Sequence, residues 1–151
     1  MLLGSMYAGM AFANAPVGAV HALAYPIGSH FHVPHGLSNS LVLPHVIRFN
    51  AAPDVASTAS CAAMYADLAD ITFQGDLSST RDVFEKSEEF ASLFEKLAAE
   101  LTIAGKLREV GIEENDITLL AREAMNQTRL LPNNARDMCH EDALEIYRKA
   151  F

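Results

Sequence analysis

The sequence contains no tryptophan, only two cysteines and little positive charge. Its 11 Lys and Arg residues against 19 Asp and Glu residues give a formal net charge of −8. Nucleic-acid-binding domains take much of their affinity from a basic surface, so this balance argues against a nucleic-acid partner. Cys61 and Cys139 form no CxxC motif and no disulfide framework, which favours free thiols in a reducing compartment, the cytoplasm. Both cysteines lie in sequence that is typical of helices, and Cys61 is expected to be a buried small side chain.

The sequence also lacks the glycine-rich and nucleophile motifs of several enzyme classes. No GxGxxG fingerprint and no P-loop is present, which indicates that the chain has no nucleotide-binding half of its own. No GxSxG elbow is present either, which argues against a hydrolytic triad of the α/β-hydrolase kind.

The apolar N-terminal stretch, residues 1–20, lacks the features of a targeting or membrane-spanning segment. It carries no Lys or Arg at its start, as a signal peptide would, and Gly and Pro interrupt its apolar run. We therefore expect a core helix here and no membrane partner. Because no polar segment precedes this helix, we expect the chain to begin in the middle of a core.

Helical periodicity covers most of the chain, and no stretch alternates as a β-strand does. Pro26 is expected to close a helix at Tyr25, Pro44 to kink or break one near Leu43, and Asp54 to cap one. Without repeats or a linker, residues 1–151 are predicted to form a single all-α domain of six to eight helices. The predicted helices are 1–14, 17–25, 37–48 (with Ser38 or Asn39 as a cap), 55–70, 81–102, 117–127 and 141–151; the predicted loops include 30–36, 72–77 and 130–137.

Residues 21–36 contain four of the six histidines, together with Pro and Gly. Neutral imidazole is the commonest protein metal ligand, and its pKa also suits proton transfer near neutral pH. The spacing alone leaves two interpretations of His21 and His35 open. They are either a metal-binding pair or a hydrogen-bonded core histidine and a loop cap, because metal sites usually show tighter spacings. His30, His32 and His35 form another candidate set of ligands, whereas His45 is expected to make a structural hydrogen bond and His140 to lie at the surface.

Several segments occur in the order that is typical of one enzyme family. They resemble the signature of the iron-containing alcohol dehydrogenases, and the resemblance covers essentially the whole chain. The N-terminal segments are Gly9-Met-Ala-Phe-Ala-Asn14, Gly18-Ala-Val-His21, Tyr25-Pro-Ile-Gly28, Pro34-His35-Gly36 and Leu43-Pro-His-Val46; the C-terminal ones are Leu107-Arg-Glu-Val-Gly-Ile112, Ala121 to Thr128, Asn133-Asn-Ala-Arg136 and Glu141-Asp-Ala-Leu-Glu-Ile-Tyr147.

The resemblance implies a fold and a set of site residues. In that family a dinucleotide-binding α/β domain precedes an all-helical domain, where one Asp and three His hold a divalent metal. His21 and His35 match two of these histidines, and the other two ligands are expected on a helix that would precede Met1. Phe12 matches a residue beside the nicotinamide. Tyr25 falls where many members carry a further histidine near the reacting centre, so its hydroxyl is a candidate catalytic group that offers a hydrogen bond in place of an imidazole.

The implied function is that of the C-terminal metal-binding portion of an NAD(P)-dependent dehydrogenase of primary alcohols or aldehydes. The implied cofactors are Fe(II) or Zn(II), with NAD(P) in the complete enzyme. We expect no activity from this chain alone, because two metal ligands and the cofactor domain are not in it. The alternative is a free-standing helical remnant or interaction module without catalytic activity. Either way, uncovered apolar faces around residues 1–25 predict a homo-oligomer or a partner chain that supplies the rest of the enzyme.

Overall fold

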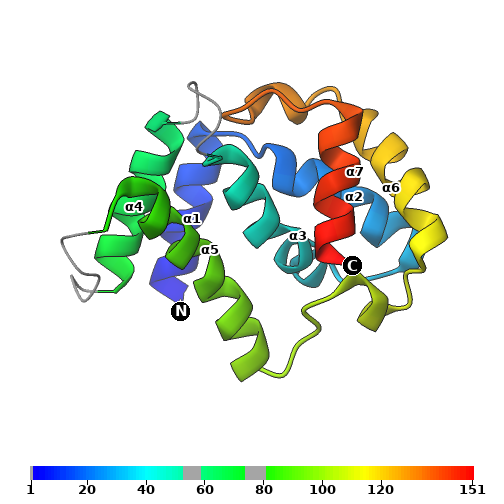
Figure 1. Cartoon of the computed structure of the whole chain (residues 1–151), viewed down its shortest axis with the longest axis horizontal. Coiled ribbons are helices and arrows are strands. Elements are labelled where there is room, and N and C mark those ends of the chain that lie inside the picture. Colours follow the sequence, from blue (N-terminus) through cyan, green and yellow to red (C-terminus); the bar gives the residue numbers. More distant parts are fainter. Residues whose placement is uncertain (1, 53–58, 74–80) are drawn as a thin grey trace.

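The computed structural model describes residues 2–52, 59–73 and 81–151, and over these ranges it contains helices and no strand. The expected all-α fold is therefore confirmed. Figure 1 shows the arrangement of the helices, with the C-terminal helix (red) beside a helix from the first third of the chain. In chain order the elements are α1 (Leu2–Asn14), α2 (Ala19–Phe31), α3 (His35–Asn50), α4 (Ala59–Thr72), α5 (Val83–Glu100), the 3₁₀ helices η2 (Leu107–Val110) and η3 (Glu114–Asp116), α6 (Ile117–Met125), the 3₁₀ helix η4 (Leu131–Asn133) and α7 (His140–Ala150).

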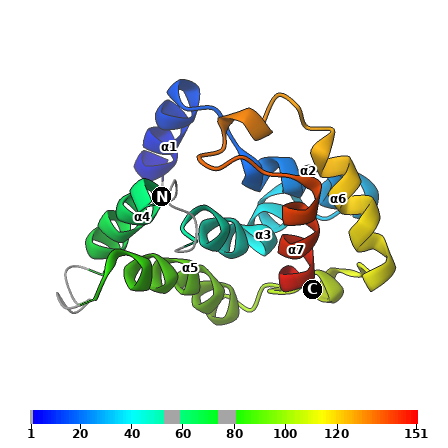
Figure 2. The ribbon, with the colours of Figure 1, turned by 45° about the horizontal axis from the view of Figure 1, so that its top comes forward.

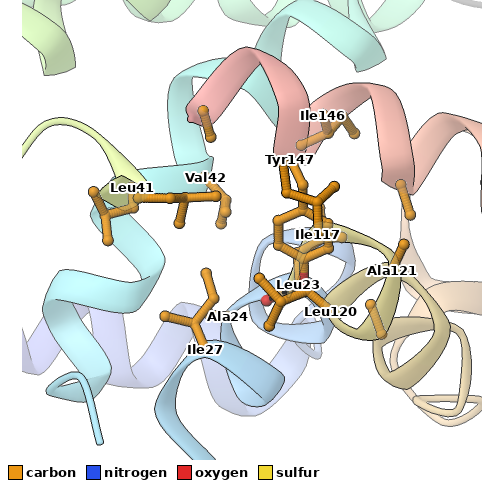
Figure 3. Packing of buried hydrophobic residues seen from close by; sticks show 14 of the residues in the cluster. Leu23, Ala24, Ile27, Leu41, Val42, Ile117, Leu120, Ala121, Ile146 and Tyr147 are labelled. Atoms are coloured by element: carbon orange, nitrogen blue, oxygen red, sulfur yellow. Dashed lines mark hydrogen bonds between the residues drawn. The ribbon is translucent and has the colours of Figure 1, made fainter. Parts of the chain in front are cut away.

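The main core lies between α2, α3, α6 and α7. Each of these helices has apolar residues at helical spacing, so each places one apolar stripe against the others. Tyr147 of α7 is fully buried, and its hydroxyl donates a hydrogen bond to the carbonyl oxygen of Leu23 in α2 at 2.6 Å. Burial raises the pKa of Tyr147 well above its ordinary value, so this hydroxyl stays protonated. Figure 3 shows the centre of the core, with Leu23, Ala24, Ile27, Leu41, Val42, Ile117, Leu120, Ala121, Ile146 and Tyr147 labelled.

Helices α4 and α5 form a hairpin that packs against α3 through α5, as Figure 2 shows. Asp82 caps α5, since its carboxylate accepts hydrogen bonds from the backbone N–H groups of Phe84 and Glu85. The buried residues of the two helices are all small (Cys, Ala or Ser), which lets their backbones approach closely. Cys61 is buried there, as expected.

Helix α1 departs from its predicted place in the core. It has no buried residue, and Leu2 is 91% exposed. Its apolar sequence correctly indicated a helix. A helix that is apolar all round requires burial, but the sequence does not say against which surface. The described residues leave this helix without a covering partner.

Two prolines lie inside helices that were predicted to end or break at them. Helix α2 continues through Pro26 to Phe31, and α3 continues through Pro44 to Asn50. Both prolines are buried, so packing on neighbouring helices outweighs the lost backbone hydrogen bond. The predicted loop 30–36 shrinks to residues 32–34, because α3 begins at His35.

The loop before α7 is fastened to the end of α3. The Asn134 side chain donates to Asn50 Oδ1 at 2.8 Å, and Arg136 donates to the Phe49 carbonyl oxygen at 2.8 Å. The Arg136 guanidinium also lies 4.0 Å from the centroid of the Phe49 ring. Cys139 is exposed at the N-cap of α7, so it lies just outside the helix in which it was expected.

Some expectations fall on residues that the structure does not describe. These are the Asp54 cap, the start of the helix predicted at residue 55, and most of the predicted loop 72–77. Among the described helices, none has the length and apolar character that crossing a membrane requires.

Candidate metal centre

His21 and His35 lie side by side where α2 and α3 meet. His21 is in the first turn of α2, and His35 is the first residue of α3. The connection between the helices is three residues, in which His32 adopts a left-handed conformation (φ 55°) and Pro34 precedes the new helix. This reversal places the two imidazole rings with their centroids 5.1 Å apart and their planes inclined by 57°.

The Nε2 atoms of both rings face a single side-chain amide, that of Asn39. Asn39 Nδ2 lies 3.4 Å from His21 Nε2 and 3.2 Å from His35 Nε2. An amide nitrogen only donates hydrogen bonds, so in this arrangement both Nε2 atoms accept and carry a lone pair. Two imidazole lone pairs therefore converge on one point.

The electrostatics of the pair favour a neutral ring at His21. Partial burial lowers the pKa of His21, and the nearby imidazole of His35 lowers it further, since two positive charges would repel each other. The neutral form is the one that binds metal ions.

Tyr25 lies beside the pair, whereas Phe12 does not. Tyr25 is one helical turn after His21, and its ring centroid is 6.2 Å from that of His35. Its side chain is 45% exposed. Phe12 is exposed on α1, and no ring contact in the described part of the chain joins it to the histidines.

The other histidines lie elsewhere. His30 and His32 are exposed at the end of α2, and the structure does not gather them with His35 into a set of three ligands. His45 faces α5 and α7, since it lines one cavity with Glu95 of α5 and another with Lys149 of α7. His140 begins α7 with a partly exposed side chain, close to the surface position expected for it.

The described residues fit half of a metal site. Two imidazole Nε2 atoms converge, but no group of three or more His, Cys, Asp or Glu side chains able to hold an ion occurs in residues 2–52, 59–73 and 81–151. Zinc and iron sites usually have three or four protein ligands, so a complete site here would need donors from outside these ranges.

Asn39 is the site residue that sequence reasoning missed. It was considered only as a helix cap, yet the helix begins four residues earlier. The signal was the spacing of four from His35, which places both side chains on one helix face once α3 is known to start at His35. Ser38 caps nothing either, because its hydroxyl donates back to the carbonyl oxygens of Val33 and Pro34.

Comparison with known proteins assigns the chain to a family. All 151 residues match the model of the Fe-containing alcohol dehydrogenase family, C-terminal. The 1,3-propanediol dehydrogenase of Citrobacter freundii is 33% identical and the long-chain-alcohol dehydrogenase 1 of Geobacillus thermodenitrificans is 36% identical, each over 100% of this chain. The chain spans 36% of the length of each of these relatives.

Solved structures show the same helical arrangement. A 1,3-propanediol oxidoreductase superposes with a TM-score of 0.82 at 30% identity, over 95% of this chain and 35% of its own. An alcohol dehydrogenase from Oenococcus oeni superposes with a TM-score of 0.81 at 27% identity, over 97% of this chain and 36% of its own. The chain belongs to the Fe-containing alcohol dehydrogenase family and matches its C-terminal helical part.

Proposed function

We propose that this chain is the C-terminal metal-binding portion of an NAD(P)-dependent dehydrogenase of primary alcohols or aldehydes. The observation that carries the proposal is the convergence of His21 Nε2 and His35 Nε2 on one point, in a chain of this family. The family implies a metal and a nicotinamide cofactor in the full enzyme.

In this proposal His21 and His35 hold Fe(II) or Zn(II) through Nε2. When bound, such a metal supplies Lewis-acid polarisation of the substrate oxygen, and NAD(P) supplies or accepts the hydride. Tyr25, one turn from His21, places its hydroxyl near the reacting centre as a hydrogen-bonding group. Phe12 would contact the nicotinamide once α1 is covered by the rest of the enzyme.

We further propose that these 151 residues are inactive alone. Two histidines leave the metal site half built, and the sequence has no dinucleotide-binding fingerprint. Segments equivalent to the rest of the relatives' length would supply the other ligands and the cofactor domain. Two free thiols fit a cytoplasmic location for the assembled enzyme.

A second candidate is a helical interaction module without catalytic activity. The observation that favours it is α1, whose residues are all exposed although most are apolar. In this alternative the histidine pair is structural, and the amide of Asn39 is its natural partner.

Native mass spectrometry of the purified chain, with anaerobic addition of Fe(II) or Zn(II), separates the two candidates. The first predicts one weakly held metal ion per chain, lost in His21→Ala and in His35→Ala but retained in the control His140→Ala. Metal binding that is absent, or equal in all four proteins, would favour the interaction module. NAD and a primary alcohol added to the metal-loaded chain should give no turnover; clear NADH formation would contradict the proposed inactivity.

A further inference from the structure

Asn39 occupies the point on which the two imidazoles converge. It follows His35 by four residues on α3, so the two side chains share one face of the helix. Its Nδ2 lies within 3.4 Å of both Nε2 atoms, and its two hydrogens are used on the two rings. The Asn39 amide therefore joins His21 of α2 to His35 of α3 at the candidate metal centre.

The oxygen of the same amide lacks a hydrogen bond among the described residues. Asn39 Oδ1 is buried and has no hydrogen-bond partner within the described residues. A buried amide oxygen without a hydrogen-bond partner is unfavourable. The orientation of Asn39 that brings Nδ2 to the two rings therefore costs free energy at Oδ1. This arrangement indicates that the Asn39 amide has a role in the candidate metal centre.

The backbone around Asn39 restricts where the amide can go. The preceding residue, Ser38, is buried and donates to the carbonyl oxygens of Val33 and Pro34 at 3.2 Å each. These bonds tie the first turn of α3, which carries His35, to the connection that precedes it. The backbone that carries His35 and Asn39 is thus held in place, while the Asn39 side chain keeps its own rotatable bonds.

We propose that Asn39 occupies the metal position in the metal-free chain: its amide hydrogens engage both Nε2 lone pairs at one point and give up that point when a metal binds. The inference rests on the proposed function, since it assumes that His21 and His35 ligate the ion. A metal takes the same two lone pairs that the amide hydrogens engage. Metal binding is therefore an exchange in which the amide of Asn39 must turn away.

The first test measures imidazole tautomers in the metal-free full chain by long-range proton–nitrogen NMR at about pH 8, where histidine is neutral. In the unsubstituted chain, His21 and His35 should both carry the proton on Nδ1. Asn39→Asp replaces the donor by a group that only accepts, so both rings should move to the Nε2–H tautomer. Asn39→Ala should give a mixture, and Ser40→Ala, at the next position, should change nothing.

The second test measures the affinity of the same proteins for Zn(II) alone by calorimetry. Because Asn39 competes with the ion for two lone pairs, Asn39→Ala should bind zinc about tenfold more tightly than the unsubstituted chain, the equivalent of two long hydrogen bonds. A residue with only a structural role would weaken binding or leave it unchanged.

The outcomes separate this inference from the proposed function. Undetectable zinc binding in the unsubstituted chain would count against the metal site, while the tautomer measurement would still test the role of Asn39. Nε2–H tautomers in the unsubstituted chain, or unchanged tautomers in Asn39→Asp, would overturn the inference. Weaker zinc binding in Asn39→Ala would also overturn it.

Discussion

His45 lies between α3, α5 and α7, away from the histidine pair. Its pKa is lowered to about 4, mainly by burial and also by the positive charges of Arg48, Lys106 and Lys149, while Glu95 on α5 acts in the opposite direction. The folded protein therefore holds His45 neutral under conditions in which the unfolded chain protonates it. The structural hydrogen bond expected for His45 stays a prediction.

This depressed pKa predicts an acid-dependent loss of stability. Between pH 6.5 and 4 the unfolded chain binds the proton more strongly, so the contribution of His45 is present above pH 6.5 and is lost as the pH falls toward 4. Allowing for partial solvent exposure, the loss is about 2 kcal/mol. Urea unfolding at pH 7 and pH 4 should show the unsubstituted chain losing about 2 kcal/mol more than His45→Gln. The partly exposed His140→Gln should behave like the unsubstituted chain, and equal losses in all three proteins would refute the prediction.

At the residue scale, the histidine pair could be predicted from the sequence, but the side chain that contacts both rings could not. Spacing alone left His21 and His35 ambiguous, and the family resemblance singled them out. Asn39 was missed because its position relative to His35 depends on where α3 begins. That start depends on the left-handed conformation of His32 and on Pro34, which shorten the loop. Neither feature is visible as a spacing in the sequence.

At the scale of helices, Arg48 joins α3 to α5. Its Nε donates to both carboxylate oxygens of Glu88 at 2.9 Å, and its Nη2 donates to Glu95 Oε2 at 2.9 Å. Glu88 and Glu95 are seven residues apart, so they lie on one face of α5. One planar guanidinium thus holds two carboxylates together, and these contacts raise the pKa of Arg48 and lower that of Glu95.

Arg48→Lys should destabilise the fold although the charge is kept. A lysine ammonium has neither the planar shape nor the number of donors needed to bond two carboxylates at once. We expect a loss of about 1 kcal/mol in the free energy of unfolding, measured by urea titration. Arg81→Lys, which alters a partly exposed pair with Glu89 alone, should cost less than about 0.5 kcal/mol. Equal losses in the two variants would show that the double contact adds nothing.

Helix boundaries near proline were the elements that sequence reasoning placed least well. Pro26 and Pro44 each remove a backbone donor, and local rules end a helix there. Both are nevertheless buried within continuous helices of the core. The Tyr147 hydroxyl, which bonds to the Leu23 carbonyl three residues before Pro26, shows the kind of long-range contact that supports α2 at this turn. Such contacts become known only with the fold.

At the scale of the whole molecule, the helical spacing of apolar residues predicted the all-α class but not the position of α1, which was expected in the core. The first 47 residues contain no Asp, Glu, Lys or Arg, so the entire net charge of −8 belongs to the remainder of the chain. Helix α1 is therefore both exposed and uncharged. Two copies of it would meet without charge repulsion, and their contact would remove apolar surface from water.

We therefore propose that the chain self-associates through α1 and expect a dimer or larger oligomer in light scattering. Leu3 and Met10 are both more than half exposed and lie two turns apart on one face. The double substitution Leu3→Glu, Met10→Glu places four carboxylates in a dimeric contact, so the protein should become monomeric with unchanged helix content. Leu101→Glu, at an equally exposed apolar position after α5, should leave the oligomer intact. A monomer in the unsubstituted chain would contradict self-association, and loss of the oligomer in Leu101→Glu alone would place the contact on another face.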